Sequence, residues 1–194
     1  MKDEIKQEIK LTKEFISKFN SKKLEGLFKH YSNYITIRRN FREAYDLISY
    51  VIKNEKEIKK NNLSNNESLI NIISACFFHS VILYTRWFKK TNNKLILKKN
   101  DFFQKESLIK DHDNFIKLRD KYIAHNESNV LGGDLFFYDP QKKELKSSYV
   151  LRPWDEPNKI KQLIEIAHNK IDKEILPKKE ENLKKELENI INKH

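Results

Sequence analysis

Cysteine, glycine and proline are scarce in this chain of 194 residues, which contains one Cys, three Gly and four Pro. Two of the glycines and three of the prolines lie between residues 132 and 157. Glycine and proline are the residues that most strongly interrupt helices and strands. The sequence therefore predicts that turns are concentrated in this window and that the rest of the chain is largely helical.

The single cysteine excludes a disulfide bond within the chain. Cys76 lies in the apolar run 72–78, where a thiol usually behaves as a small buried hydrophobic side chain, and no basic residue nearby in the sequence would lower its pKa. Cysteine and histidine spacings typical of zinc sites, clustered carboxylates and a glycine-rich phosphate loop are also missing. We therefore expect no metal ion and no cofactor.

Long apolar segments are missing too. No unbroken run of about 18 apolar residues is present that would predict a membrane span. The first residues, MKDEIKQEIK, are charged, unlike a secretory signal. We expect a cytoplasmic protein that does not insert into a membrane. The 39 Lys and Arg outnumber the 28 Asp and Glu, so the formal charge is +11, which favours an anionic partner, with nucleic acid first and a membrane surface second.

Hydrophobic residues make up 38% of the chain and charged residues 35%, which suits one folded domain over residues 1–194 with a strongly solvated surface. Apolar residues recur at steps of three and four in six segments, as expected of amphipathic helices. These segments predict helices over residues 2–20, 32–60, 67–90, 104–125, 157–176 and 178–192. The segment 67–90 is the most apolar, nearly all round, and is expected to be the central, buried helix. Residues 21–29 are expected to form a looser connection with room for a short helical turn, and Pro177 is expected to end the fifth helix.

The pattern changes between residues 130 and 157. Two short apolar or alternating runs, 135–138 and 145–151, flank the turn-like sequence 139–143 and predict a β-hairpin over about 130–155. The expected fold class is all-α, an up-and-down bundle of four to five long helices with a small β-hairpin insertion near 130–157.

The sequence RDKYIAH, from Arg119 to His125, lies near the end of the predicted fourth helix. At about 100° per residue, His112 and Arg119 lie within or beside the apolar stripe of this helix, whereas His125 lies about 120° around it from Arg119. Arg119 and His125 can converge if the helix frays at its end. They can also converge if two copies of the helix meet across a twofold axis.

RDKYIAH resembles the nuclease signature of the HEPN superfamily, in which an arginine, a polar residue, a spacer and a histidine form a metal-independent ribonuclease site. The resemblance is best over residues 67–125 and implies a helical bundle. It also implies a homodimer in which two arginines and two histidines meet in a composite site. Prokaryotic members of this type act as toxins or abortive-infection proteins in antiviral defence, which implies an antitoxin or another defence protein as a further partner.

Arg119 and His125 have the chemistry that such a site needs. RNA cleavage without metal uses the 2′-hydroxyl as nucleophile, so a group that titrates near neutral pH must move protons and a fixed cation must stabilise the charge on the phosphate. Histidine suits the first task and arginine the second. The resemblance implies products with a 2′,3′-cyclic phosphate and a 5′-hydroxyl.

Three neighbours of the two catalytic candidates receive supporting roles. The resemblance places Asp120 at the polar position after the arginine, where it would orient Arg119 or His125. His112 resembles a histidine found in some prokaryotic members. Asn126 would cap the helix or help to position a phosphate, and we favour capping.

Three further residues are candidates for contact with RNA. Lys121 and Tyr122 would flank bound RNA, although Tyr122 also belongs to the apolar stripe and suits packing. Arg86 would contact a second phosphate, stack on an aromatic ring or pair with a carboxylate, and we favour the pairing. The alternative function is a non-catalytic HEPN-like module that binds RNA, a nucleotide or a protein partner, and a third option is a structural or antitoxin-like interaction protein.

Overall fold

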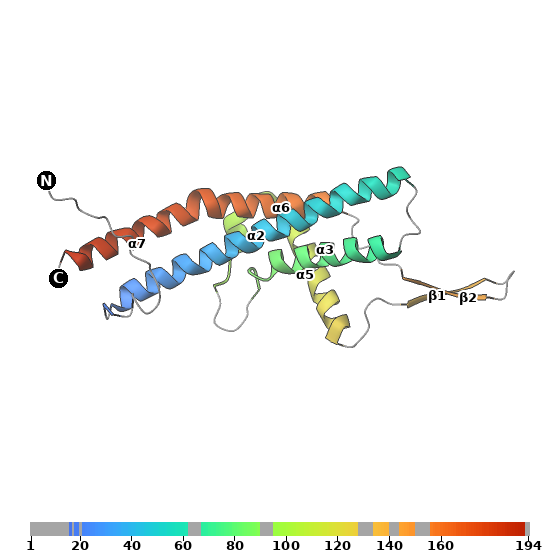
Figure 1. Ribbon diagram of the computed structural model, residues 1–194, viewed down its shortest axis with the longest axis horizontal. Helices are drawn as coiled ribbons and strands as arrows, with labels where there is room; N and C mark the ends of the chain where they lie inside the picture. Colours follow the sequence, from blue (N-terminus) through green and yellow to red (C-terminus); the bar gives the residue numbers. More distant parts are fainter. Residues whose placement is uncertain are drawn as a thin grey trace. The chain divides into compact units, whose positions relative to one another are not determined.

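The computed structural model is mostly helical, in agreement with the all-α fold class. It describes residues 16, 18–19, 21–61, 67–89, 95–127, 134–139, 144–149 and 156–192. Its elements in chain order are α2 (Lys22–Asn61), α3 (Glu67–Thr85), α4 (Lys99–Phe102), α5 (Glu106–Glu127), β1 (Asp134–Asp139), β2 (Glu144–Tyr149), α6 (Pro157–Lys170), the π-helical η2 (Ile171–Ile175) and α7 (Leu176–Ile191) (Figure 1). Most of the helix predicted over residues 2–20 lies outside the described residues.

The chain divides into two compact units. Unit 1 comprises Met1–Arg38 and Lys170–His194, and unit 2 comprises Arg39–Asn169. Residues 22–38 of α2 belong to unit 1 and residues 39–61 to unit 2. The single domain expected over residues 1–194 stays a prediction.

The core of unit 1 joins residues that are distant in the sequence. Ile16, Leu24 and Leu183 are buried in one cluster, with exposures of 1%, 0% and 3%. Partly buried hydrophobic residues pack against this cluster: Phe19, Leu27, Phe28, Tyr31, Leu187 and Ile190. The beginning of α2 therefore buries one side against α7.

The looser connection predicted over residues 21–29 is wrong, because α2 begins at Lys22 rather than near residue 32. The Ser21 hydroxyl accepts the backbone N–H of Leu24 at 3.3 Å, in the manner of an N-cap. Gly26 costs a helix about 1 kcal/mol relative to alanine. Burial of Leu24 and its apolar neighbours outweighs this cost.

The helix end predicted at Pro177 is also wrong. Residues 157–191 are helical throughout, and η2 lies directly before α7. In η2 the backbone N–H of Leu176 donates to the carbonyl of Ile171, five residues earlier, which is a π-type turn. Pro177 then lies in the first turn of α7, where a proline removes no essential hydrogen bond. The wider π-helical segment accommodates the proline without ending the helix.

In unit 2, α3 packs against α5, and the short α4 also contacts α5. The Ser80 hydroxyl donates to the carbonyl of Ala44 at 2.9 Å, which ties α3 to α2, and the rings of Phe41 and Tyr84 lie 5.9 Å apart. In α6, the buried side chains recur at helical spacing and form one stripe, Ile160, Leu163, Ile164 and Ala167. The helices predicted over 67–90 and 104–125 correspond to α3 and α5, which end at Thr85 and Glu127.

Helix α3 is apolar over most of its length. By length and composition alone, Ser68–Thr85 qualifies as a membrane span, with a mean hydropathy of 1.6, although no such segment is expected from the pattern of apolar residues. Half of this window is buried inside the protein, and Ile72, on the other side, is 51% exposed. Burial of α3 is therefore one-sided, not complete as its composition suggested.

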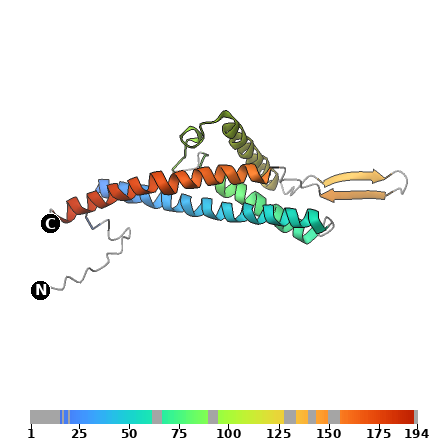
Figure 2. The ribbon, with the colours of Figure 1, turned by 90° about the horizontal axis from the view of Figure 1, so that it is seen from above.

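The two strands pair antiparallel, with Asp134 opposite Tyr149 and Asp139 opposite Glu144 (Figure 2). The turn predicted between them falls on residues 140–143, which lie outside the described residues. The number of helices in the predicted bundle and the hairpin as an insertion stay predictions.

Candidate functional site

Helix α5 carries both catalytic candidates. It is helical from Glu106 to Glu127, so positions 119 and 125 belong to one unbroken helix. Six helical residues rotate by about 120° and rise by about 9 Å along the axis, so the two positions stand on different sides of α5. The side chains of Lys121, Tyr122, His125 and Asn126 lie outside the described residues.

The Arg119 side chain is held at the inner side of α5, with 15% of it exposed. One terminal nitrogen, Nη1, donates to Oδ1 of Asp120 at 3.3 Å. The Nε atom is buried and has no hydrogen-bond partner within the described part of the chain. The contact with Asp120 uses Nη1 and leaves the Nε donor of Arg119 unused. A buried donor without an acceptor costs about 1–3 kcal/mol, so a ligand that accepts from Nε would be favoured.

Asp120 contacts a second cation that the sequence did not single out. The Lys89 ammonium forms an ion pair with Oδ2 of Asp120, while Arg119 contacts Oδ1 of the same carboxylate. Lys89 lies in the turn after α3, 31 residues before its partner. Nothing in the local sequence distinguished this lysine from its many neighbours, because only the packing of α3 against α5 brings it to Asp120.

His112 lies on the same side of α5 as Arg119, since seven residues make almost two full turns. It is 2% exposed, and its Nδ1 lies 2.7 Å from the hydroxyl of Tyr84 in α3. Aromatic rings enclose it, with the Phe88 centroid at 4.6 Å and the Phe103 centroid at 5.3 Å. The histidine is therefore part of a packed aromatic cluster.

Burial lowers the pKa of His112 to about 4; nearby Asp113 opposes this shift and Lys99 adds to it. Burial also raises the pKa of Tyr84 well above its ordinary value, and Asp113 adds to that rise. At neutral pH the imidazole is thus neutral and the phenol keeps its proton. In the tautomer with the proton on Nε2, the Tyr84 hydroxyl donates to Nδ1 of His112. These properties favour a packing role over a catalytic one for His112.

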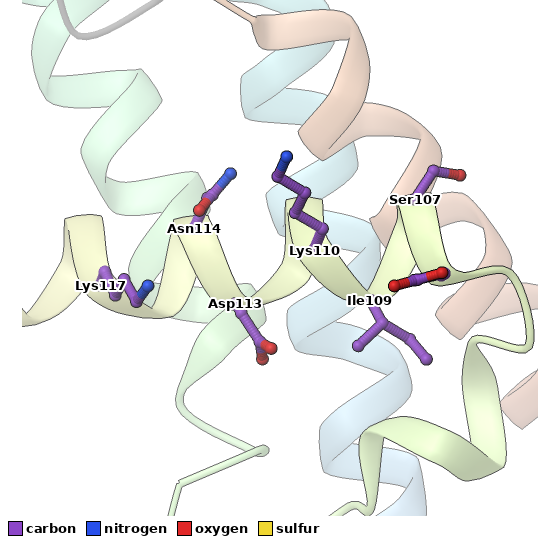
Figure 3. A pocket seen from close by; sticks show the side chains of 7 residues that line it. Ser107, Ile109, Lys110, Asp113, Asn114 and Lys117 are labelled. Atoms are coloured by element: carbon purple, nitrogen blue, oxygen red, sulfur yellow. The ribbon is translucent and has the colours of Figure 1, made fainter.

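The outer side of α5 carries an open hollow of about 590 Å³. Its lining comes from this helix alone: Glu106, Ser107, Ile109, Lys110, Asp113, Asn114 and Lys117 (Figure 3). Lys99 of α4 contacts both carboxylate oxygens of Asp113, at 2.7 and 2.8 Å. Position 125 follows Asn114 by eleven residues, or about three turns. It therefore stands on the same side of α5 as part of the hollow, away from the side that holds Arg119.

The Arg86 guanidinium lies over the ring of Trp87, 5.5 Å from its centroid. Of the three roles considered for Arg86, the structure therefore contains the aromatic stack, and no carboxylate partner of Arg86 is found among the described residues. The described residues also contain no group of three or more His, Cys, Asp or Glu side chains placed to hold a metal ion.

In comparisons with known proteins, no family model, no curated protein and no solved structure matches this chain. The features of this chain that bear on a function are the RDKYIAH sequence, the basic charge and the geometry around Arg119.

Proposed function

We propose that this protein is a metal-independent endoribonuclease of the HEPN type, with Arg119 and His125 as its catalytic residues. The observation that carries the proposal is the state of Arg119, a largely buried guanidinium held by the adjacent Asp120 at the polar position of RDKYIAH. The Arg119 guanidinium lies beside the apolar side of α5 and has an N–H donor without a partner, so it suits binding of an anionic ligand. The formal charge of +11 adds support.

In the proposed reaction the 2′-oxygen of RNA loses its proton and attacks the adjacent phosphorus. The bond from phosphorus to the 5′-oxygen breaks, and that oxygen gains a proton. His125 moves these protons, and Arg119 donates hydrogen bonds to the phosphate oxygens as their negative charge rises. The products carry a 2′,3′-cyclic phosphate and a 5′-hydroxyl, and water and metal are not reactants.

The site is proposed to be completed by a second copy of the chain. Because α5 is helical through both positions, one copy holds residues 119 and 125 about 120° apart. Two copies of α5 related by a twofold axis would bring Arg119 of one chain toward His125 of the other. The proposed bundle is the up-and-down arrangement of four to five helices, with the hairpin as an insertion.

A cytoplasmic toxin or abortive-infection role, with an antitoxin or another defence protein as partner, belongs to the same proposal. It is supported by the RDKYIAH sequence and by the HEPN-type site proposed for it.

The test incubates the protein of residues 1–194 with single-stranded RNA in the presence of a metal chelator and identifies the ends of the products. Arg119→Ala and His125→Ala are expected to abolish cleavage. Arg42→Ala and His79→Ala are matched controls, because Arg42 is exposed in an ion pair with Asp46 and His79 is exposed opposite Glu43. Cleavage that survives both site substitutions would overturn the assignment. RNA binding without cleavage under any condition would favour the non-catalytic binding module.

A further inference from the structure

Three charged side chains meet where the end of α3 approaches α5. Lys89 contacts one oxygen of the Asp120 carboxylate, and Arg119 contacts the other. The two cations are therefore both within reach of a single small anion. Their three formal charges leave one net positive charge at this point.

The three side chains differ in their access to solvent. Asp120 is 45% exposed and Lys89 34% exposed, whereas Arg119 is only 15% exposed. The carboxylate is thus the most exposed member of the cluster. The guanidinium is largely buried, and its Nε has no acceptor within the described part of the chain.

A phosphate group suits the place that the Asp120 carboxylate occupies. Both are oxyanions that accept two or more hydrogen bonds from cationic donors, and arginine binds both through its forked N–H groups. A phosphate group carries its negative charge on more oxygens than the Asp120 carboxylate does, so it can accept hydrogen bonds from both cations at once. Exchange of the carboxylate for a phosphate would keep both cations paired.

We propose that Lys89 and Arg119 form a binding site for one phosphate group of RNA, in which Asp120 serves as an internal counter-ion that the phosphate displaces. This inference rests on the proposed function, because it takes the phosphate to belong to the RNA substrate. It assigns Lys89 to substrate binding and gives Asp120 a role beyond orienting Arg119.

The two substitutions that test the site have opposite expected effects. Lys89→Met removes a cation and is expected to weaken RNA binding roughly tenfold, the usual scale for one charge-assisted hydrogen bond. The dependence of affinity on salt should become shallower by about 0.7, because one phosphate fewer is neutralised on a single strand. Lys89→Arg is expected to restore most of the affinity. Asp120→Asn removes the competing anion and is expected to tighten binding while it lowers the cleavage rate, because Arg119 loses its partner.

The probe is a single-stranded oligoribonucleotide with 2′-O-methyl groups, which binds but cannot be cleaved, and binding is titrated over a range of salt concentrations. Lys185→Met is the matched control, since Lys185 is an exposed lysine in an ion pair with Glu181. Thermal unfolding of each variant reports whether it folds. If Lys89→Met does not fold, the tighter RNA binding expected of Asp120→Asn still tests the proposed site.

A double variant separates direct contact from an effect through the carboxylate. If Lys89 touches the phosphate, Lys89→Met should still weaken binding when Asp120 is already Asn. If this weakening disappears in that background, or if Asp120→Asn weakens binding instead of tightening it, the site is overturned.

The outcomes also separate this inference from the nuclease proposal. Cleavage by the unaltered protein, together with unchanged affinity and salt dependence in Lys89→Met, would overturn the phosphate site and leave the nuclease standing. RNA binding that depends on both Lys89 and Arg119, without any cleavage, would support the phosphate site and overturn the nuclease.

Discussion

The Tyr84 hydroxyl and Nδ1 of His112 lie 2.7 Å apart in the interface between helices α3 and α5. Tyr84 is fully buried and His112 is 2% exposed, so the two polar atoms serve each other away from water. Buried polar groups are tolerated when they are paired, and the cost of breaking such a pair is large. The contact therefore fixes α3 against α5 and determines how the protein should respond to pH.

Stability should fall as the pH drops from about 6.5 to about 4, because burial lowers the pKa of His112 to about 4 in the folded chain. Between these values the unfolded chain binds a proton at His112 that the folded chain excludes. The contribution of neutral His112 to the free energy of unfolding is complete above the pKa of this histidine in the unfolded chain, about 6.5. It is lost progressively as the pH falls below that value, by roughly 3 kcal/mol in all. Urea denaturation over this pH range measures it. His112→Gln should flatten the dependence, whereas His79→Gln, at an exposed position, should not change it.

Replacement of Tyr84 by Phe should lower the free energy of unfolding by about 1–3 kcal/mol, because the buried Nδ1 of His112 loses its partner. Tyr50→Phe is the matched control, since Tyr50 is 42% exposed. Its expected effect is within about 0.5 kcal/mol. Equal effects in the two variants, measured by chemical denaturation, would contradict the structural importance of the Tyr84 to His112 contact.

Leu24→Ala should destabilise unit 1 by about 2–5 kcal/mol, because Leu24 is completely buried against Leu183 and leaves a cavity when truncated. Leu187→Ala removes a partly buried leucine from the edge of the same cluster and should cost less. Thermal unfolding of both variants provides the comparison. A neutral Leu24→Ala would argue that residues 22–31 do not pack as a helix.

Mixing two inactive variants tests whether the proposed site is shared between chains. In an equal mixture of Arg119→Ala and His125→Ala with free subunit exchange, about half of the dimers are mixed, and each holds one intact Arg119–His125 pair where the unaltered dimer holds two. About a quarter of the original cleavage activity should therefore return.

A site built within one chain would give a different result in that mixture. Every chain would then lack one catalytic residue, and no activity would return at any mixing ratio. Sedimentation at micromolar concentration provides the independent check, since a fully active monomer is incompatible with the shared site.

Several elements follow from the sequence because helical periodicity is a local property. The seven-residue spacing of His112 and Arg119 was enough to place them on one side of a helix, and their low exposures, 2% for the whole His112 residue and 15% for the Arg119 side chain, agree with that side being buried. The apolar spacing of residues 160–167 likewise predicted the buried stripe of α6. Such patterns need no knowledge of the rest of the fold.

Local rules failed where distant residues decide the outcome. Residues 21–29 and Pro177 were both expected to interrupt helices, yet α2 runs through the first and a π-helical turn accommodates the second. At Gly26, burial of Leu24 and its apolar neighbours exceeds the cost of a poor helix former. At Pro177, the first-turn position and the π-helical turn before it allow the helix to continue. The sequence does not record which segment provides that burial.

The sequence by itself determined the helical character of the chain, its basic charge and the order of residues around α5. Only the tertiary structure decided that Lys89 meets Asp120 across 31 residues and that Tyr84 meets His112 across 28. The physical reason is that a helix is specified by neighbours within one or two turns. A contact between helices depends on how all the apolar surfaces pack together, and that packing gives Asp120 its second cationic neighbour, Lys89.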